Sequence, residues 1–329
     1  MPANVQTMAY YGEVPWHGLG REVPKGVTAE KMIHAASLDW EVELRPARGA
    51  REINRKKEFS RYEVVRVPRP NTKENEVLLG VVSRRYQPLQ NVEAFSFFNP
   101  IVGDGKAYFE TAGALGEGER IWVMAKMPKA MEIVKGDECF KYLLLSNTHS
   151  GDGSVIVKFT TVRVVCQNTL MLAMEDGQKA YRVRHSKQMQ FKLDELAEFL
   201  AITQEVFQKA EEQFRLLAKI QMIENRLDHY FEAVFPRTPA QRKKGETPKR
   251  WEQVRQVFET RKDLQLPGVR GTLWGAYNAI TRFEDYKQPR QEEQPDQRLE
   301  RTWFGGGADT KLRALAKASE LAASWMNDR

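Results

Sequence analysis

The sequence predicts an α+β fold, with a curved antiparallel sheet and helices in the N-terminal half and a long amphipathic helix in a helical C-terminal half. Two observations predict this fold. Short runs rich in β-branched and aromatic residues, separated by Gly, Pro and Asp turns, fill residues 40–165. From Leu193 onward, apolar residues recur at spacings of three and four, which is the period of a helix. The change of period divides the chain into a predicted sheet domain, residues 1–190, and a predicted helical region, residues 191–329.

Turn residues bound each predicted element of the first half. Thr28 is a typical N-cap for a short helix over residues 29–38, and residues 91–99 predict a helix between strands. The predicted strands cover residues 40–44, 62–67, 77–82, 108–112, 120–127, 140–145 and 155–165.

The second half is predicted to be helical. One long helix is expected from Leu193 to about Phe235, where Pro236 and Pro239 end it. Its apolar seam is typical of core packing, and self-association is the alternative. An exposed basic loop is predicted over residues 236–250. Further helices are expected over residues 251–261, 273–286 and 311–325, the last with Asp309 or Thr310 near its N-cap.

The segment 162–173 changes character in its middle. A β-branched run stops at residues 166–169 and an apolar, helix-like run follows. Asn168 and Thr169 are therefore expected to cap a helix, and free N–H groups at a helix N-terminus bind anions such as phosphate. The alternative is an ordinary strand-to-helix cap with no ligand.

Positive charge is concentrated in two zones. The formal net charge is +7. Residues 45–73 hold ten Lys and Arg against three Glu, and residues 235–262 hold nine against three, so the rest of the chain is net acidic. Two basic zones on an otherwise acidic protein indicate a surface for a polyanion. Solvated basic loops are the alternative.

The sequence offers little for catalysis or for a cofactor. The five histidines are scattered, without the spacing of a zinc site, and no serine stands in a Gly-x-Ser-x-Gly frame. Residues 305–311 are Gly-rich but do not match a nucleotide-binding P-loop. Cys139 and Cys166 are expected to be reduced core thiols, which favours the cytoplasm. We therefore expect no metal, no cofactor, no catalytic residue and no membrane span, and a non-enzymatic role is favoured.

Cations alternate with aromatic residues in three segments. These are Lys56-Lys57-Glu58-Phe59-Ser60-Arg61-Tyr62, Arg84-Arg85-Tyr86 and Tyr181-Arg-Val-Arg-His185. Proteins that bind single strands use this pairing, because the charges follow the phosphates while the rings stack on bases. Strand alternation puts Arg182 and Arg184 on one face, opposite Val183. The predicted nucleic-acid-binding residues are Lys56, Lys57, Phe59, Arg61, Tyr62, Arg84, Arg85, Tyr86, Lys158, Arg163, Asn168, Thr169, Arg182, Arg184, Lys187 and Lys311.

Three blocks of the sequence resemble the phage/plasmid-like family known as a domain of unknown function, number nine-three-two. They are residues 15–20 with the helix ending at Trp40, the block Arg163-Val-Val-Cys-Gln-Asn-Thr-Leu170, and residues 272–281 followed by 304–311. The chain departs from the family at Asp285-Tyr286, where members carry Asp-His. The resemblance implies a mobile-element setting in a bacterial host cell but implies no reaction.

A fold-level similarity extends this expectation. The predicted curved sheet, long helix and basic strand faces are similar to the Rad-fifty-two-type single-strand annealing proteins, which assemble into rings or filaments. The leading hypothesis is therefore an oligomeric protein that binds and anneals single-stranded DNA for recombination. The alternatives are a metal-dependent nuclease or nucleotide hydrolase, with Asp152, Glu175 and Asp176 as candidate carboxylates, and an inhibitor of host defence that binds an acidic protein.

Overall fold

The computed structural model describes residues 5–12, 19–50, 60–68, 75–163, 168–171, 180–199, 203–223, 225–286, 301–303 and 305–327. The chain forms two compact units that alternate along the sequence. Unit 1 comprises residues 1–128, 142–158 and 180–203, and unit 2 comprises residues 129–141, 159–179 and 204–329. The division at residue 190, which rests on composition, stays a prediction.

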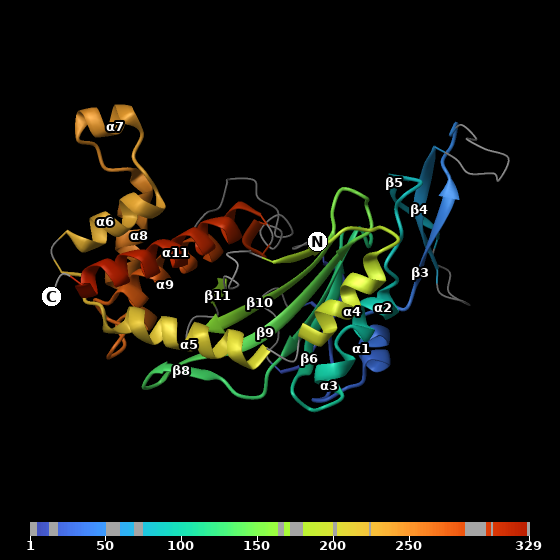
Figure 1. Cartoon of the computed structure of the whole chain (residues 1–329), viewed down its shortest axis with the longest axis horizontal. Coiled ribbons are helices and arrows are strands. Elements are labelled where there is room, and N and C mark those ends of the chain that lie inside the picture. Colours follow the sequence, from blue (N-terminus) through green and yellow to red (C-terminus); the bar gives the residue numbers. More distant parts are fainter. Residues whose placement is uncertain are drawn as a thin grey trace. The chain divides into compact units, whose positions relative to one another are not determined.

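The fold is α+β, as the sequence predicts (Figure 1). Nine of the described strands form one sheet in the order β11-β10-β9-β7-β6-β1-β2, with β12 on β10 and β8 on β9. Its strands pair mainly in the antiparallel sense, and β1 pairs with β2 in parallel. The strands are β1 (Val5–Tyr10), β2 (Arg21–Glu22), β6 (Tyr108–Leu115), β7 (Arg120–Lys126), β8 (Met131–Val134), β9 (Asp137–Thr148), β10 (Val155–Arg163), β11 (Asn168–Met171) and β12 (Tyr181–Val183).

A second, three-stranded sheet lies in unit 1. It has the order β3 (Glu41–Pro46), β4 (Arg61–Val67) and β5 (Val77–Ser83), with antiparallel pairing throughout. The outer edge of β3 is covered by a side chain: the Val42 N–H donates to Gln90 Oε1 at 3.0 Å, and Gln90 Nε2 donates to the Val42 carbonyl at 2.9 Å. These strands and the strands of the large sheet confirm all seven strand predictions.

The short helices of unit 1 also follow the sequence. Thr28 caps α1 (Ala29–Ala35) by accepting a hydrogen bond from the Lys31 N–H at 3.4 Å. The predicted helix over residues 91–99 is divided into α2 (Asn91–Ser96) and α3 (Asn99–Val102). Met32 and Ile33 of α1 and Phe95 of α2 are buried, so these helices contribute to the core.

The predicted helix after residue 166 is wrong. Residues 168–171 form β11, which pairs antiparallel with β10 in the register Arg163 with Asn168 and Thr160 with Met171. A short apolar run is compatible with either a buried strand or a helix, and here the open edge of β10 decides the outcome. Asn168 and Thr169 therefore cap no helix at this point, and the expected anion site at a helix N-terminus is absent from them.

The single long helix is also wrong. The chain forms α4 (Met189–Phe199), α5 (Thr203–Lys219) and α6 (Arg226–Val234). After Lys219 the backbone pairs with a distant segment instead: the Leu273 N–H donates to the Ile220 carbonyl at 2.9 Å, and the Met222 N–H donates to the Gly271 carbonyl at 2.8 Å. Leu227 and Phe231 of α6 are buried, so the predicted apolar face of the helix is present in α6.

Unit 2 is built around α9 (Leu273–Tyr286), whose bounds match the prediction. Its residues are buried except Arg282 and Tyr286, and the Trp274 indole N–H donates to Asp137 Oδ2 at 2.7 Å. The other helices of the unit are α7 (Pro239–Lys244), α8 (Lys249–Thr260), a 3-10 turn (Lys262–Leu264) and α11 (Gly306–Asn327).

Two boundaries in unit 2 correct the sequence analysis. The predicted basic loop over residues 236–250 contains α7, and the final helix begins at Gly306 rather than at Lys311. Asp309 and Thr310 are therefore in the first turn of α11, not at its cap, and Thr310 Oγ1 donates to the Gly306 carbonyl at 2.9 Å. None of the described helices is both long enough and apolar enough to cross a bilayer.

Candidate nucleic-acid interface

Two of the three predicted cation-rich segments meet at the end of the small sheet. In the β4–β5 register, Arg61 is opposite Ser83 and Tyr62 is opposite Val82. Arg84 and Arg85 directly follow Ser83, so they lie beside Arg61. All three arginines are exposed, and Tyr62 is half-buried.

A ring contact joins the third segment to them. The Tyr86 and His185 rings stack with centroids 4.6 Å apart and planes 25° apart. The Gln87 N–H donates to the His185 carbonyl at 3.3 Å, and His185 Nδ1 donates to the Gln87 carbonyl at 3.0 Å. A carbonyl only accepts, so Nδ1 carries the proton of this imidazole. These contacts hold the chain at residues 84–87 against the chain at residues 184–187.

The alternation predicted for the third segment is confirmed. β12 pairs with β10, with Arg182 opposite Ile156 and Val183 opposite Val155. Arg182 and Arg184 are exposed while Val183 and His185 are buried, and Lys187 is exposed in the following turn. His185 is the residue that the sequence analysis missed, although its position two residues after Val183 already indicates the buried face.

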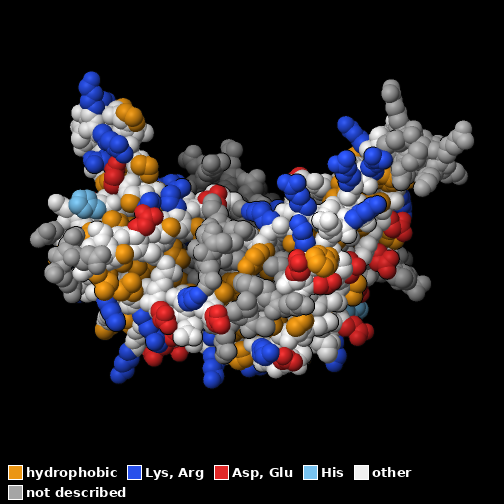
Figure 2. All heavy atoms as spheres, in the orientation of Figure 1, with side chains coloured by type: hydrophobic (Ala, Val, Ile, Leu, Met, Phe, Trp, Pro, Cys, Tyr) orange, Lys and Arg blue, Asp and Glu red, His pale blue; other side chains and the backbone are white. Residues whose placement is uncertain are grey.

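We call the resulting cluster the basic surface: Arg61, Arg84, Arg85, Arg182, Arg184 and Lys187. Within the described ranges, no carboxylate forms an ion pair with Arg61, Arg85, Arg182, Arg184 or Lys187. Figure 2 shows Lys and Arg side chains gathered over the region where Figure 1 places β4 and β5. Asp152 is exposed next to Gly151, which packs on Val82, so one carboxylate borders this surface.

A buried polar layer of neutral groups supports the basic surface. The Tyr86 hydroxyl donates to the Thr148 carbonyl at 3.4 Å, and the His149 ring lies 3.1 Å from Asn91 Oδ1 through its Nε2. Burial, together with the nearby His185, lowers the pKa of His149 to about 3, and burial also lowers the pKa of His185. Burial raises the pKa of Tyr86. The positive charge above this layer therefore comes from arginine and lysine alone.

Three predicted residues have roles different from contact with a nucleic acid. The Tyr86 ring is 8% exposed and already stacked on His185, so it supports the surface instead of offering a face to a base. Lys158 is buried in β10. Lys311 is fully buried in unit 2, where its Nζ donates to Asp285 Oδ1 at 2.7 Å. Burial raises the pKa of the adjacent Glu284, although Arg250, Arg301 and Lys311 act in the opposite direction.

Several predicted residues, or their side chains, lie outside the described part of the chain. Lys56, Lys57 and Phe59 lie outside the described residues, as do Cys166, Glu175 and Asp176, and so do the side chains of Arg163, Asn168 and Thr169. Cys139 is buried and is not in a disulfide, as predicted for a reduced core thiol. In the part of the chain that is described, no group of three or more His, Cys, Asp or Glu is arranged to hold a metal ion.

The fold and this site define an α+β protein whose basic surface is assembled from three separate segments. The family model described as Domain of unknown function (DUF932) matches residues 78–303, and the chain belongs to this family. The match includes the Tyr86–His185 contact and begins after Arg61. Comparison with curated proteins and with solved structures gave no match.

Proposed function

We propose that this protein binds single-stranded DNA through the basic surface and anneals it as an oligomer, without catalysis, in the recombination of a phage or plasmid in a bacterial host cell. The observation that carries the proposal is the stacked Tyr86–His185 pair, because it brings two cation-rich segments together beside Arg61. Arg85, Arg182 and Arg184 are exposed and form no ion pair within the described ranges, and exposed cations set close together are what a phosphate backbone requires.

Tyr62 supports the choice of a single strand over a duplex. It is the half-buried aromatic residue that neighbours Arg61 on β4. An aromatic ring beside cations can stack its face on an unpaired base, and such stacking contributes roughly 1–3 kcal/mol per base. A duplex keeps its bases stacked on one another and gains nothing from this residue. The cytoplasmic location and the ring or filament assembly are further parts of the proposal.

The direct test is binding of a fluorescein-labelled single-stranded oligonucleotide, followed by anisotropy across a salt series. The variant Arg85→Glu/Arg184→Glu removes two phosphate contacts, so the slope of log K against log salt should fall by about 1.4, at about 0.7 per contact on a single strand. The matched control is Arg21→Glu/Lys31→Glu, which makes the same change of net charge at exposed positions in β2 and α1. Equal effects of the two pairs would contradict a localised site.

A second measurement isolates the aromatic contribution. Tyr62→Leu keeps an apolar side chain on β4 but removes the ring, so it should weaken binding of single strands by about fivefold or more while leaving duplex binding nearly unchanged. A variant that loses both kinds of binding equally would indicate a contact with phosphates only. Strand annealing would then be measured on the same variants by the rate at which two complementary labelled strands pair.

A further inference from the structure

Helix α7 in unit 2 contributes nothing to the hydrophobic core. None of its residues, Pro239–Lys244, is buried. In Figure 1 it stands at one end of the unit, beyond α6 and α8. Hydrophobic burial is the usual reason for a helix this short to be ordered, since isolated short helices are not stable in water. Other interactions must hold α7 in place.

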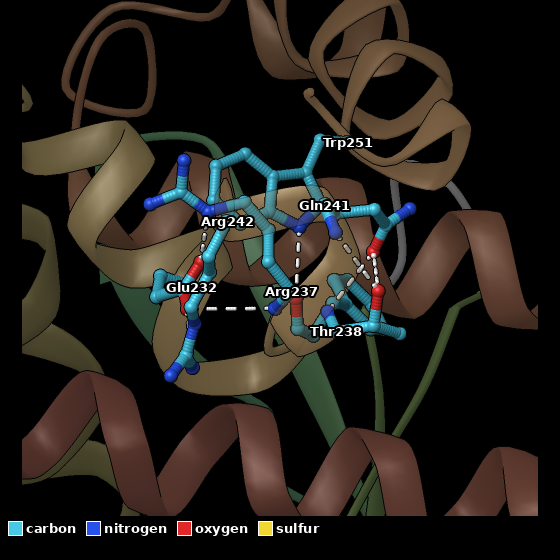
Figure 3. Close-up of polar contacts among 7 residues, drawn as sticks. Glu232, Arg237, Thr238, Gln241, Arg242 and Trp251 are labelled. Atoms are coloured by element: carbon cyan, nitrogen blue, oxygen red, sulfur yellow. Dashed lines mark hydrogen bonds and ion pairs between the residues drawn. The ribbon is translucent and has the colours of Figure 1, made fainter. Parts of the chain in front are cut away.

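Specific polar contacts hold it (Figure 3). Thr238 Oγ1 accepts from the Gln241 N–H at 3.3 Å, and Gln241 Oε1 accepts from the Thr238 N–H at 3.0 Å, which is a capping box. Gly245, at φ +67°, ends the helix in a left-handed conformation that glycine adopts without strain. The Trp251 indole N–H donates to the Phe235 carbonyl at 3.0 Å and fastens the start of α8 to the end of α6.

Glu232 of α6 anchors the same region. It accepts hydrogen bonds from Arg237 at 2.8 Å and from Arg242 at 2.8 Å (Figure 3). Desolvation opposes ionisation, but the two arginines prevail and lower the pKa of Glu232 below its ordinary value. Arg237 and Arg242 are therefore matched by an anion of the protein itself, and their role is to position α7.

The lysines of this region are not used in that way. Lys243, Lys244 and Lys249 are exposed, and within the described ranges Lys243 and Lys249 form no ion pair. Lys244 lies 3.7 Å from Glu246 between two exposed side chains, so solvent screens that pair. Lys249 opens α8, where the helix dipole disfavours a cation. We call residues 237–250 the basic projection.

We propose that the basic projection is a second nucleic-acid contact, which binds the phosphate backbone of single and double strands alike. Caps and ion pairs hold this helix outward, so that the adjacent Lys243 and Lys244 present their positive charge to solvent. Its described exposed side chains include no aromatic ring, so it has no means of preferring unpaired bases. The basic projection can bind DNA whether or not the basic surface of unit 1 does.

The composition of the projection argues against other partners. A stable protein interface has an apolar or aromatic centre, and a membrane-binding basic helix needs an apolar face. Pro239 and Ala240 are the apolar residues of α7, and neither makes such a face. A regular array of phosphates is the partner that cations alone can hold.

The test compares a single strand and a duplex of equal length by anisotropy over a salt series. Lys243→Glu/Lys244→Glu should weaken binding of both, and the slope of log K against log salt for the duplex should fall by about 1.8, at about 0.9 per contact. Lys243→Arg/Lys244→Arg keeps the charge and should bind as the wild type does. Lys135→Glu/Lys219→Glu makes the same change of net charge at exposed positions elsewhere in unit 2 and should have little effect.

The outcomes separate this inference from the proposed function. Unchanged binding by the Lys243/Lys244 reversal, or an equal loss in the Lys135/Lys219 control, would overturn the inference. If Arg85→Glu/Arg184→Glu alone abolishes binding while the reversal on α7 has no effect, the proposed function stands and the inference fails. If only the reversal on α7 weakens binding, the inference stands and the basic surface of unit 1 is not the site.

Discussion

Each unit contains a buried polar cluster, and the two clusters differ in charge. The cluster of unit 1 is neutral: His149 Nε2 lies 3.1 Å from Asn91 Oδ1 and 3.3 Å from Asn147 Nδ2, Asn147 Nδ2 donates to the Leu89 carbonyl, and the lowered pKa of His149 keeps it uncharged. The cluster of unit 2 is charged: Lys311 and Asp285 form an ion pair in the interior. A neutral network and an ion pair respond differently to mutation and to pH.

The difference shows that residue type does not reveal function. The sequence predicts that Lys311, which follows a Gly-rich turn, is a phosphate ligand. In the structure its Nζ is paired with Asp285 instead. Lys243 stands in an ordinary basic run, yet it is exposed on a helix that contributes no buried residue. Lys311 has a carboxylate partner, whereas Lys243 has none within the described residues. The sequence alone does not predict which lysine has such a partner.

The largest effect is expected from the buried ion pair of unit 2. Lys311→Met leaves Asp285 buried beside a neutral side chain, and breaking such a pair costs about 3–5 kcal/mol of the free energy of unfolding. The measurement is urea unfolding followed by circular dichroism.

A control and a rescue sharpen this test. Lys317→Met removes one member of an exposed pair with Glu320 in the same helix, and the free energy of unfolding should change by less than about 0.5 kcal/mol. Replacing both partners, as in Asp285→Leu/Lys311→Met, should cost less than Lys311→Met alone. Equal stability of Lys311→Met and Lys317→Met would mean that Lys311 is not paired in the interior.

An intermediate effect is expected from the neutral network of unit 1. The unfolded chain binds a proton at His149 with a pKa of about 6.5, whereas the folded protein does so only near pH 3. Between these values the unfolded state holds more protons, so stability falls as the pH falls. From pH 7 to pH 5 the loss from His149 should be about 2 kcal/mol.

Two variants identify the source of that pH dependence. His149→Gln removes the titrating group, so the decline in the free energy of unfolding between pH 7 and pH 5 should be shallower than in the wild type. His229→Gln, at an exposed position in α6, should leave the decline unchanged. A decline of the same steepness in all three proteins would assign the effect to other groups.

The smallest effects are expected from two helix caps. Thr28→Ala should lower the free energy of unfolding by about 1 kcal/mol, because α1 packs Met32 and Ile33 into the core of unit 1. Thr238→Ala should leave the global transition almost unchanged, because α7 buries nothing, but it should speed amide hydrogen exchange at residues 240–245. Equal global losses would mean that α7 is part of the cooperative core.

Much of the fold could be predicted from local pattern. Strands β3 to β7, β9 and β10 are bounded by turn residues and rich in β-branched and aromatic residues, and both features are local properties of the chain. Thr28 and the bounds of α9 were likewise readable from neighbouring residues. These elements need no information about distant partners.

The failures with the largest effect on the fold and on the candidate site involve a distant partner. Residues 168–171 form a strand because β10 offers an edge, and the helix after residue 193 is interrupted because residues 220–222 pair with residues 271–273. The burial of Lys311 depends on Asp285, and the burial of Tyr86 depends on His185. The exposed arginines of the candidate site followed from strand alternation, whereas their gathering depends on a contact between residues 99 positions apart.

The side chain of Gln90 has a consequence for how copies of this protein can meet. Its carboxamide has the shape of a peptide group and takes up both the N–H and the carbonyl of Val42, as an adjoining strand would. An incoming chain therefore finds this stretch of β3 already occupied and cannot lengthen the small sheet there. Assembly of this protein therefore cannot use backbone pairing at that stretch of β3.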